Sequence, residues 1–207
     1  TSSLVGSEMC IRDRLNAKLS KDYVTVCAVF DNEEVGSGTK QGAGSTFFPE
    51  VLKRISYLCE KNEEEYYMAV ADSFMLSADN AHAVHPNYQD KTDPTNRPYI
   101  NEGIVLKYNA SQKYTTDANS AALVKYLCKK EKIKCQVFFN RSDMLGGSTL
   151  GNILTGQVSI KAADIGLPQL SMHSTYETAG CKDLDDMITL MAVSYTHLRA
   201  HETRRHL

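Results

Sequence analysis

Short apolar runs alternate with segments of helical period along this sequence, and that alternation restricts the chain to few folds. The run Val24–Phe30, "VTVCAVF", is nearly unbroken and rich in β-branched residues, which predicts a strand buried on both faces. Shorter apolar runs predict further strands at Met68–Ala71, Val105–Tyr108 and Val137–Asn140. Strands that alternate with helices favour an α/β fold, in which helices cover both faces of a sheet.

The first predicted helix follows the run at 24–30. Apolar residues recur at helical spacing from Phe48 to Leu58. Ser45 or Thr46 is expected to cap its start, and the acidic run Glu63–Glu65 is expected to end it in solvent.

Two more helices are predicted further along the chain. Asp117–Lys132 carries apolar residues on one face, and Asp183–Met191 forms a closing helix. The polar stretch Asn87–Asn101 contains prolines and predicts a long loop.

Composition argues against several classes of protein. The formal charge of -2 and the absence of a basic stripe argue against a nucleic-acid partner or an anionic membrane surface. No apolar run approaches the roughly 20 residues of a membrane span. The six cysteines include no C-x-x-C pair, which is typical of reduced thiols in a cytoplasmic protein.

The two ends of the sequence are related through their coding DNA. Leu4–Asp13, "LVGSEMCIRD", can be back-translated so that the reverse complement encodes "VSYTHLRAHE", which is Val193–Glu202. An inverted match over ten codons is not expected by chance, and the DNA resembles a transposase adapter used in library preparation. We therefore expect residues 1–14 and 192–207 to be translated adapter, and residues 15–191 to carry the fold.

Glu33 and Glu34 stand side by side where the first apolar run ends. Two adjacent carboxylates repel each other, and burying them costs several kcal/mol unless a cation compensates. Asp79, His82 and His173 also follow apolar runs, where functional residues of α/β sheets gather. Carboxylates with imidazoles suit zinc, manganese or cobalt. One glutamate could then ligate the metal while the other takes a proton from water as general base.

Each of these signals alone has a simpler explanation. Adjacent glutamates are common in solvated turns, and Asp79 could instead cap a helix that begins at "DNAHAVH". A single histidine such as His173 is more often a surface or core residue than a metal ligand.

Four longer motifs carry a resemblance to a known family. "FDNEEVGS", "SADNAHAVHPNY", "RSDMLGGSTLG" and "DIGLPQLSMHSTYETAG" resemble the M18 aspartyl aminopeptidases, from about Tyr23 to Met191. The resemblance implies a three-layer mixed sheet of the zinc-exopeptidase type and two zinc ions per complete site, which cobalt or manganese could replace. It also implies a large homo-oligomer that removes N-terminal aspartate or glutamate from peptides.

The same resemblance implies roles for the metal-centre residues. By similarity, Glu33 is the general base, Glu34 and His173 bind one metal ion, and Asp79 binds the other.

It also implies substrate contacts. His82 lines the substrate pocket, and Lys107 contacts the substrate, where a cation would pair with an acidic side chain. In the turn "GGST", Gly147 and Ser148 would bring backbone N–H groups close to the substrate.

The family's first histidine ligand, its bridging aspartate and its inserted dimerisation domain all precede "FDNEE". We therefore expect this sequence to be a C-terminal catalytic fragment with weak metal binding and little activity alone. Two alternatives stay open: another dinuclear metallohydrolase of broader specificity, and a non-catalytic, peptidase-like scaffold protein.

Overall fold

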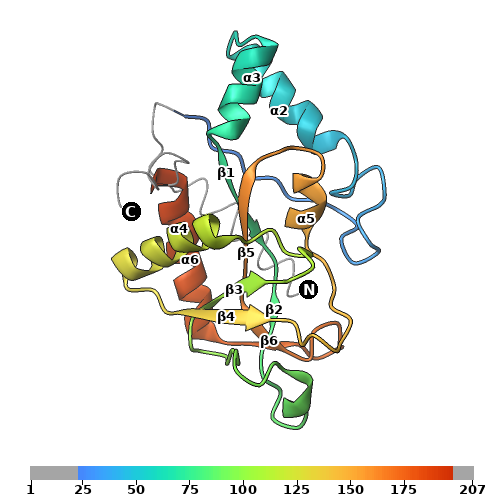
Figure 1. Ribbon diagram of the computed structural model, residues 1–207, viewed down its shortest axis with the longest axis vertical. Coiled ribbons are helices and arrows are strands. Elements are labelled where there is room, and N and C mark those ends of the chain that lie inside the picture. Colours follow the sequence, from blue (N-terminus) through green and yellow to red (C-terminus); the bar gives the residue numbers. More distant parts are fainter. Residues whose placement is uncertain (1–22, 198–207) are drawn as a thin grey trace.

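The computed structural model describes residues 23–197 of the chain (Figure 1). Its helices are α2 (Phe47–Leu58), α3 (Glu63–Ala71), the 3-10 helix η1 (Gln89–Lys91), α4 (Ala118–Glu131), α5 (Leu150–Thr155) and α6 (Cys181–His197). Its strands are β1 (Phe74–Ala78), β2 (Ala81–His82), β3 (Ile104–Tyr108), β4 (Cys135–Phe139), β5 (Lys161–Gly166), β6 (Pro168–Leu170) and β7 (Thr178–Ala179).

The larger sheet is mixed. Its four strands have the order β1-β5-β3-β4, in which β1 and β5 are parallel, β5 and β3 antiparallel, and β3 and β4 parallel. A smaller sheet of order β2-β6-β7 continues from the ends of β1 and β5. The chain therefore leaves the large sheet at residue 79 and after residue 166, and both exits lead to the candidate site.

Helices cover both faces of the large sheet (Figure 1). On one face, α4 and α6 form the main core with β3, and Leu106, Leu127 and Leu190 are fully buried there. Burying each such side chain stabilises the fold by about 1.5–3 kcal/mol. On the other face, Phe48 of α2 and Leu154 of α5 pack with Met75 of β1. The predicted mixed α/β architecture with helices on both faces is therefore confirmed.

The helix predicted at Asp117–Lys132 is confirmed as α4. Asp117 is its N-cap, and its side chain accepts a hydrogen bond from the backbone N–H of Ser120, whose side chain bonds back to Asp117 N. Lys132 ends the helix in the left-handed conformation, with φ 58°. The strands predicted near Val105 and Val137 are confirmed with small shifts of their ends. The closing helix is confirmed as α6, but it extends six residues beyond its predicted end at Met191.

The strand predicted at Met68–Ala71 is wrong, because these residues form the end of α3. The acidic run Glu63–Glu65 begins this helix instead of ending the previous one. Asn62 caps it, with a reciprocal hydrogen bond between Glu65 and the Asn62 backbone. Carboxylates in a first turn are stabilised by the helix dipole, so the acidic run favours a helix start. The strand itself, β1, comes three residues later.

The strand predicted at Val24–Phe30 is also wrong for the described residues. The segment has no regular secondary structure and pairs with none of the described strands, and Val24 and Val29 are 60% and 46% exposed. β-Branched residues favour a pleated, packed surface, but a strand needs a neighbouring strand for its hydrogen bonds. Phe30 instead packs against Phe47 and Phe48 of α2.

Residues 1–14 and 198–207 of the two predicted adapter segments lie outside the described residues. Residues 192–197 continue α6, and the hydroxyl of Tyr23 donates to the carbonyl of Thr196 at 2.7 Å. The boundaries at 14 and 192 stay a prediction. Among residues 23–197, every helix is too short or too polar to traverse a lipid bilayer.

Candidate active site

All the residues that the sequence singled out line one open cavity: Glu33, Glu34, Asp79, His82, Lys107, Gly147, Ser148 and His173. The cavity volume is about 2290 Å³, compared with roughly 300–1,000 Å³ for a small-molecule pocket. The cavity also reaches α2 and α6, so it extends beyond the candidate site. Asp79 reaches this cavity directly after β1 and His173 reaches it after β6, whereas Glu33 and Glu34 reach it from a turn before α2.

A tight turn holds the two glutamates. Asn32 adopts a positive φ of 59°, a conformation that asparagine tolerates better than most residues. Gly36 N donates to Glu33 O at 2.9 Å, and Ser37 N donates to Asn32 O at 3.1 Å. This backbone turn fixes Glu33 and Glu34 at the cavity wall without using their carboxylates.

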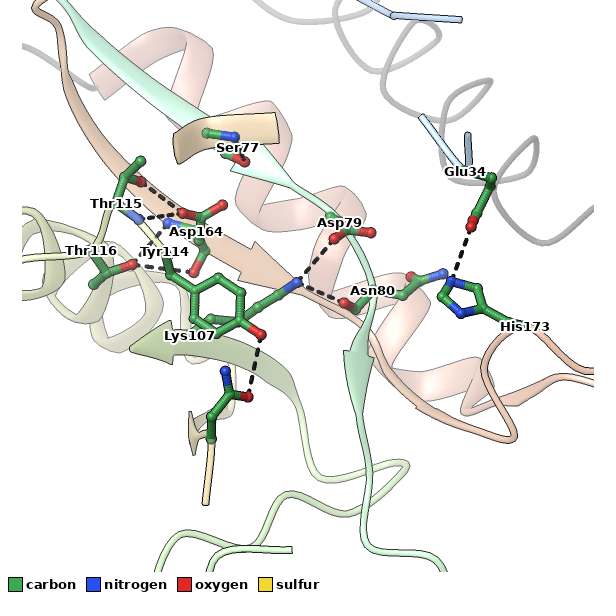
Figure 2. A network of polar contacts seen from close by, with 12 residues as sticks. Glu34, Ser77, Asp79, Asn80, Lys107, Tyr114, Thr115, Thr116, Asp164 and His173 are labelled. Carbon is green, nitrogen blue, oxygen red and sulfur yellow. Dashed lines mark hydrogen bonds and ion pairs between the residues drawn. The ribbon is translucent and has the colours of Figure 1, made fainter. Parts of the chain in front are cut away.

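Glu34 faces His173 across the cavity (Figure 2). The Oε2 atom of Glu34 lies 3.0 Å from Nε2 of His173, and both side chains are about two-thirds exposed, at 63% and 65%. His173 has a positive φ of 66°, and its backbone N–H donates to Glu177 Oε1 at 2.7 Å. The strained turn therefore directs the imidazole toward Glu34.

Asp79 lies directly after β1 and meets Lys107 from β3 (Figure 2). The ammonium of Lys107 is 3.2 Å from Asp79 Oδ2 and donates to the carbonyl of Asn80 at 2.7 Å. Lys107 is only 2% exposed, and its ammonium lies 5.2 Å from the centre of the Tyr114 ring. Lys107 is therefore committed to protein groups and does not present a free cation to the cavity.

Burial raises the pKa of the Glu33 carboxyl above its ordinary value of 4.5. The negative charges of Asp79 and Glu34 raise this pKa further, while His173 and Lys107 act in the opposite direction. A carboxyl group with a raised pKa exchanges a proton more readily near neutral pH, as a general acid or base must.

His82 lies on β2, where it is the register partner of Gln169 on β6. The His82 side chain is exposed on β2. The protein around it nevertheless displaces water from the imidazole and so lowers its pKa below 6.5, and the positive charges of Lys107 and His173 lower this pKa further against the effect of Asp79. A neutral imidazole at this position can accept a hydrogen bond from a substrate.

Gly147 and Ser148 lie in the loop before α5. A Cβ atom on Gly147 would meet no atom within 4 Å, so its backbone is accessible from the cavity. On Gly146, in contrast, a Cβ atom would lie 2.0 Å from Nδ2 of Asn140, so a larger residue there would displace the Asn140 side chain.

The described residues supply the kinds of donor that zinc prefers. Glu34 and His173 are a carboxylate and an imidazole that already converge, and both are common zinc ligands. Asp79 is paired with Lys107 instead. Within residues 23–197, no three histidine, cysteine, aspartate or glutamate side chains gather closely enough to hold a metal ion. The residue types therefore suit zinc, but the described residues supply too few ligands for a complete site.

Sequence reasoning missed the buried residues that hold Tyr114 against Lys107. Asp164 on β5 is fully buried and accepts hydrogen bonds from the backbone N–H of Thr115 at 2.6 Å and from its hydroxyl at 2.8 Å (Figure 2). These bonds hold the segment that carries Tyr114 against Lys107. The sequence signal for them was Asp164 within the apolar run "KAADIG", because a carboxylate in a buried strand needs hydrogen-bond donors around it.

Residues 6–195 match the model of a family described as "Aminopeptidase I zinc metalloprotease (M18)". A "Probable M18 family aminopeptidase 2" of Clostridium acetobutylicum is 48% identical over 169 residues, which make up 82% of this chain and 39% of that relative. The chain spans about two-fifths of the length of the curated relatives that it matches.

Solved structures share the fold. The cryo-EM structure of the "Ape4 and Nbr1 complex" matches with a TM-score of 0.80 and 38% identity, over 86% of this chain and 34% of that one. The structure of the yeast "mApe1 dodecamer" matches with a TM-score of 0.77 and 27% identity, over 96% of this chain and 44% of that one.

Proposed function

The chain belongs to the M18 family of zinc metalloproteases, and we propose that it is the C-terminal catalytic part of an aminopeptidase that removes aspartate or glutamate from the N-terminus of peptides. The observation that carries this proposal is that Glu33, Glu34, Asp79 and His173 all line one open cavity. The pairing of Glu34 with His173 at 3.0 Å gives further support.

Each residue has a role in the proposed reaction. Glu33 takes a proton from the attacking water and returns it to the leaving amine. Glu34 and His173 hold one zinc ion, and Asp79 holds a second; when bound, zinc supplies Lewis-acid polarisation of the peptide carbonyl. The ligands that complete these two sites belong to the part of the protein outside residues 23–197.

His82, Gly147 and Ser148 position the peptide in this proposal. The lowered pKa of His82, caused first by desolvation from the surrounding protein, supports a neutral imidazole that accepts a substrate N–H. The open space at Gly147 supports a close approach of the peptide to the backbone of this loop.

A second candidate is a dinuclear metallohydrolase of broader specificity. The contacts of Lys107 favour this broader hydrolase, because the lysine ammonium is buried and is held by Asp79 and by the Asn80 carbonyl. A lysine in this state would have to leave Asp79 before it could pair with an acidic substrate side chain.

We further propose that the complete protein is a homo-oligomer in the cytoplasm. The dodecamer named for a structural neighbour supports the assembly, and the free thiols of the described cysteines suit a reducing compartment. A scaffold role is the non-catalytic rival, since another neighbour was solved in complex with Nbr1.

The test is hydrolysis of aspartyl, glutamyl and leucyl anilides by the complete protein that contains this sequence, with added zinc. We expect release from the acidic substrates and a loss of at least about 10²-fold in kcat for Glu33→Gln, as for other general bases. Glu50→Gln, on the first turn of α2, is the matched control and should keep wild-type activity. Cleavage of the leucyl substrate as fast as the acidic ones would support the broader hydrolase. Absence of hydrolysis of any substrate by the zinc-loaded protein would support the scaffold role.

A further inference from the structure

Lysine and arginine side chains are few on the walls of the candidate cavity. Those among its lining residues are Lys61, Lys91, Lys107 and Arg141. A substrate that carries a carboxylate is stabilised by a cation on these walls. The present contacts of the four side chains show which of them is available for that role.

Two of the lysines already form ion pairs. The ammonium of Lys107 is buried beside Asp79. The ammonium of Lys61 lies 3.1 Å from Glu65 Oε1 at the start of α3. Neither lysine could bind a substrate carboxylate without leaving its present partner.

Arg141 also has partners, and they tie together two segments of the cavity wall. Its Nε atom donates to Asp143 Oδ1 at 2.6 Å. The same guanidinium donates to the carbonyl of Asp90 in η1. The loop between β4 and α5, which carries the glycines proposed to approach the substrate, is therefore bound to the 3-10 helix that ends at Lys91.

Lys91 is the remaining cation. Its side chain is exposed and lines the cavity, and among the described residues its ammonium has no hydrogen-bond or ion-pair partner. The main chain of η1 is nevertheless held, because Lys91 N donates to Tyr88 O at 3.1 Å and Arg97 donates to the Gln89 side chain at 3.0 Å. The backbone at Lys91 is thus fixed at the cavity wall, while its ammonium is free to bind a ligand.

We propose that Lys91 binds a carboxylate of the peptide substrate. That carboxylate is either the side chain of an N-terminal aspartate or glutamate, or the C-terminal carboxylate of a short peptide, since an ammonium is a compact charge that pairs with both. The inference rests on the proposed peptidase function and gives the cavity a cation other than the committed Lys107.

The test compares lysine variants of the complete protein that contains this sequence, loaded with zinc. The substrates are aspartyl, glutamyl and leucyl anilides, and the tripeptide aspartyl-alanyl-alanine as the free acid and as its C-terminal amide. We expect Lys91→Met to raise KM about 2–5-fold for each substrate that presents the bound carboxylate, the effect of an exposed ion pair. Lys91→Arg should restore the wild-type KM, because it keeps the positive charge.

The pattern across the substrates identifies the source of the carboxylate. A rise in KM for the acidic anilides but not for the leucyl anilide would assign the side chain of the N-terminal residue. A rise for the tripeptide acid but not for its amide would assign the C-terminal carboxylate. Added salt should reduce either difference, because salt screens charges that are exposed to solvent.

The matched control is Lys130→Met, because Lys130 is an exposed lysine of α4, outside the cavity wall. This variant should keep the wild-type KM for every substrate.

Three results would contradict the inference, and they can be told apart. Unchanged KM values in Lys91→Met would overturn the role of Lys91 and leave the proposed peptidase function intact. An equal change for all substrates that Lys91→Arg does not reverse would also overturn it, because the effect would be on structure and not on charge. A complete protein that cleaves none of the substrates would overturn the proposed function, and the role of Lys91 with it.

Discussion

The ammonium of Lys107 on β3 lies 3.2 Å from the carboxylate of Asp79, which directly follows β1, and in this ion pair the lysine is buried while the aspartate is 34% exposed. The sequence suggested that Lys107 would pair with an acidic substrate. In the folded chain its three donor positions are directed to Asp79, the Asn80 carbonyl and the face of Tyr114. Lys107 therefore orients Asp79 before any substrate contact.

Replacement of Lys107 should measure the strength of this arrangement. Lys107→Met keeps the length of the side chain but leaves the Asn80 carbonyl without its donor. We expect a loss of about 1–3 kcal/mol in the free energy of unfolding, which urea denaturation of the chain can measure. The control is Lys134→Met, because Lys134 pairs with Glu102 at 62% and 57% exposure, and such surface pairs contribute only about 0–1 kcal/mol. Equal losses in both variants would contradict the prediction.

The capping box of α3 predicts a pH dependence. The hydrogen bond from the Asn62 backbone, followed by that from Lys61, lowers the pKa of Glu65 below 4.5. Because the folded pKa is depressed, the stabilisation is present above pH 4.5 and is lost as the pH falls through the lower, folded value. Glu65→Gln should therefore lower the urea midpoint at pH 6 and have little effect at pH 2.5. Glu64→Gln, in the same first turn but outside the box, should not show this pH-dependent difference.

Two glycines should respond differently to alanine. Gly103 has a φ of 101°, and a Cβ atom there would lie 2.2 Å from the Lys134 carbonyl oxygen. We expect Gly103→Ala to destabilise the chain by at least about 1–3 kcal/mol, since strain and overlap add. Gly147→Ala has open space and should stay within about 0.5 kcal/mol of wild type. If Gly147→Ala also raises KM in the complete protein, the loop approaches the substrate as proposed.

The origin of the chain ends can be tested on the source DNA. Long reads across codons 13 and 193 should lose the adapter-like sequence and continue into coding sequence with further metal ligands upstream. Reads that encode Leu4–Asp13 and Val193–Glu202 unchanged in the genome would contradict the adapter hypothesis.

Local chemistry in the sequence was enough to place several elements. The apolar stripe within Asp117–Lys132 predicted α4, because helical period acts within a few residues. The structure adds the reciprocal cap between Asp117 and Ser120. The same local reasoning failed at Met68–Ala71, since an apolar run of four residues fits a strand or the end of a helix equally well. The cap at Asn62 decides between them.

The sequence by itself singled out Glu33, Glu34, Asp79 and His173 as the candidate site residues, because they stand in motifs that resemble those of the M18 family. Only the tertiary structure decided which of them meet. Glu34 pairs with His173, and Asp79 pairs with Lys107, across separations that no local pattern encodes. The physical reason is that helices and turns depend on neighbours along the chain, whereas these contacts depend on the order and register of β1, β5 and β3, which long-range burial selects.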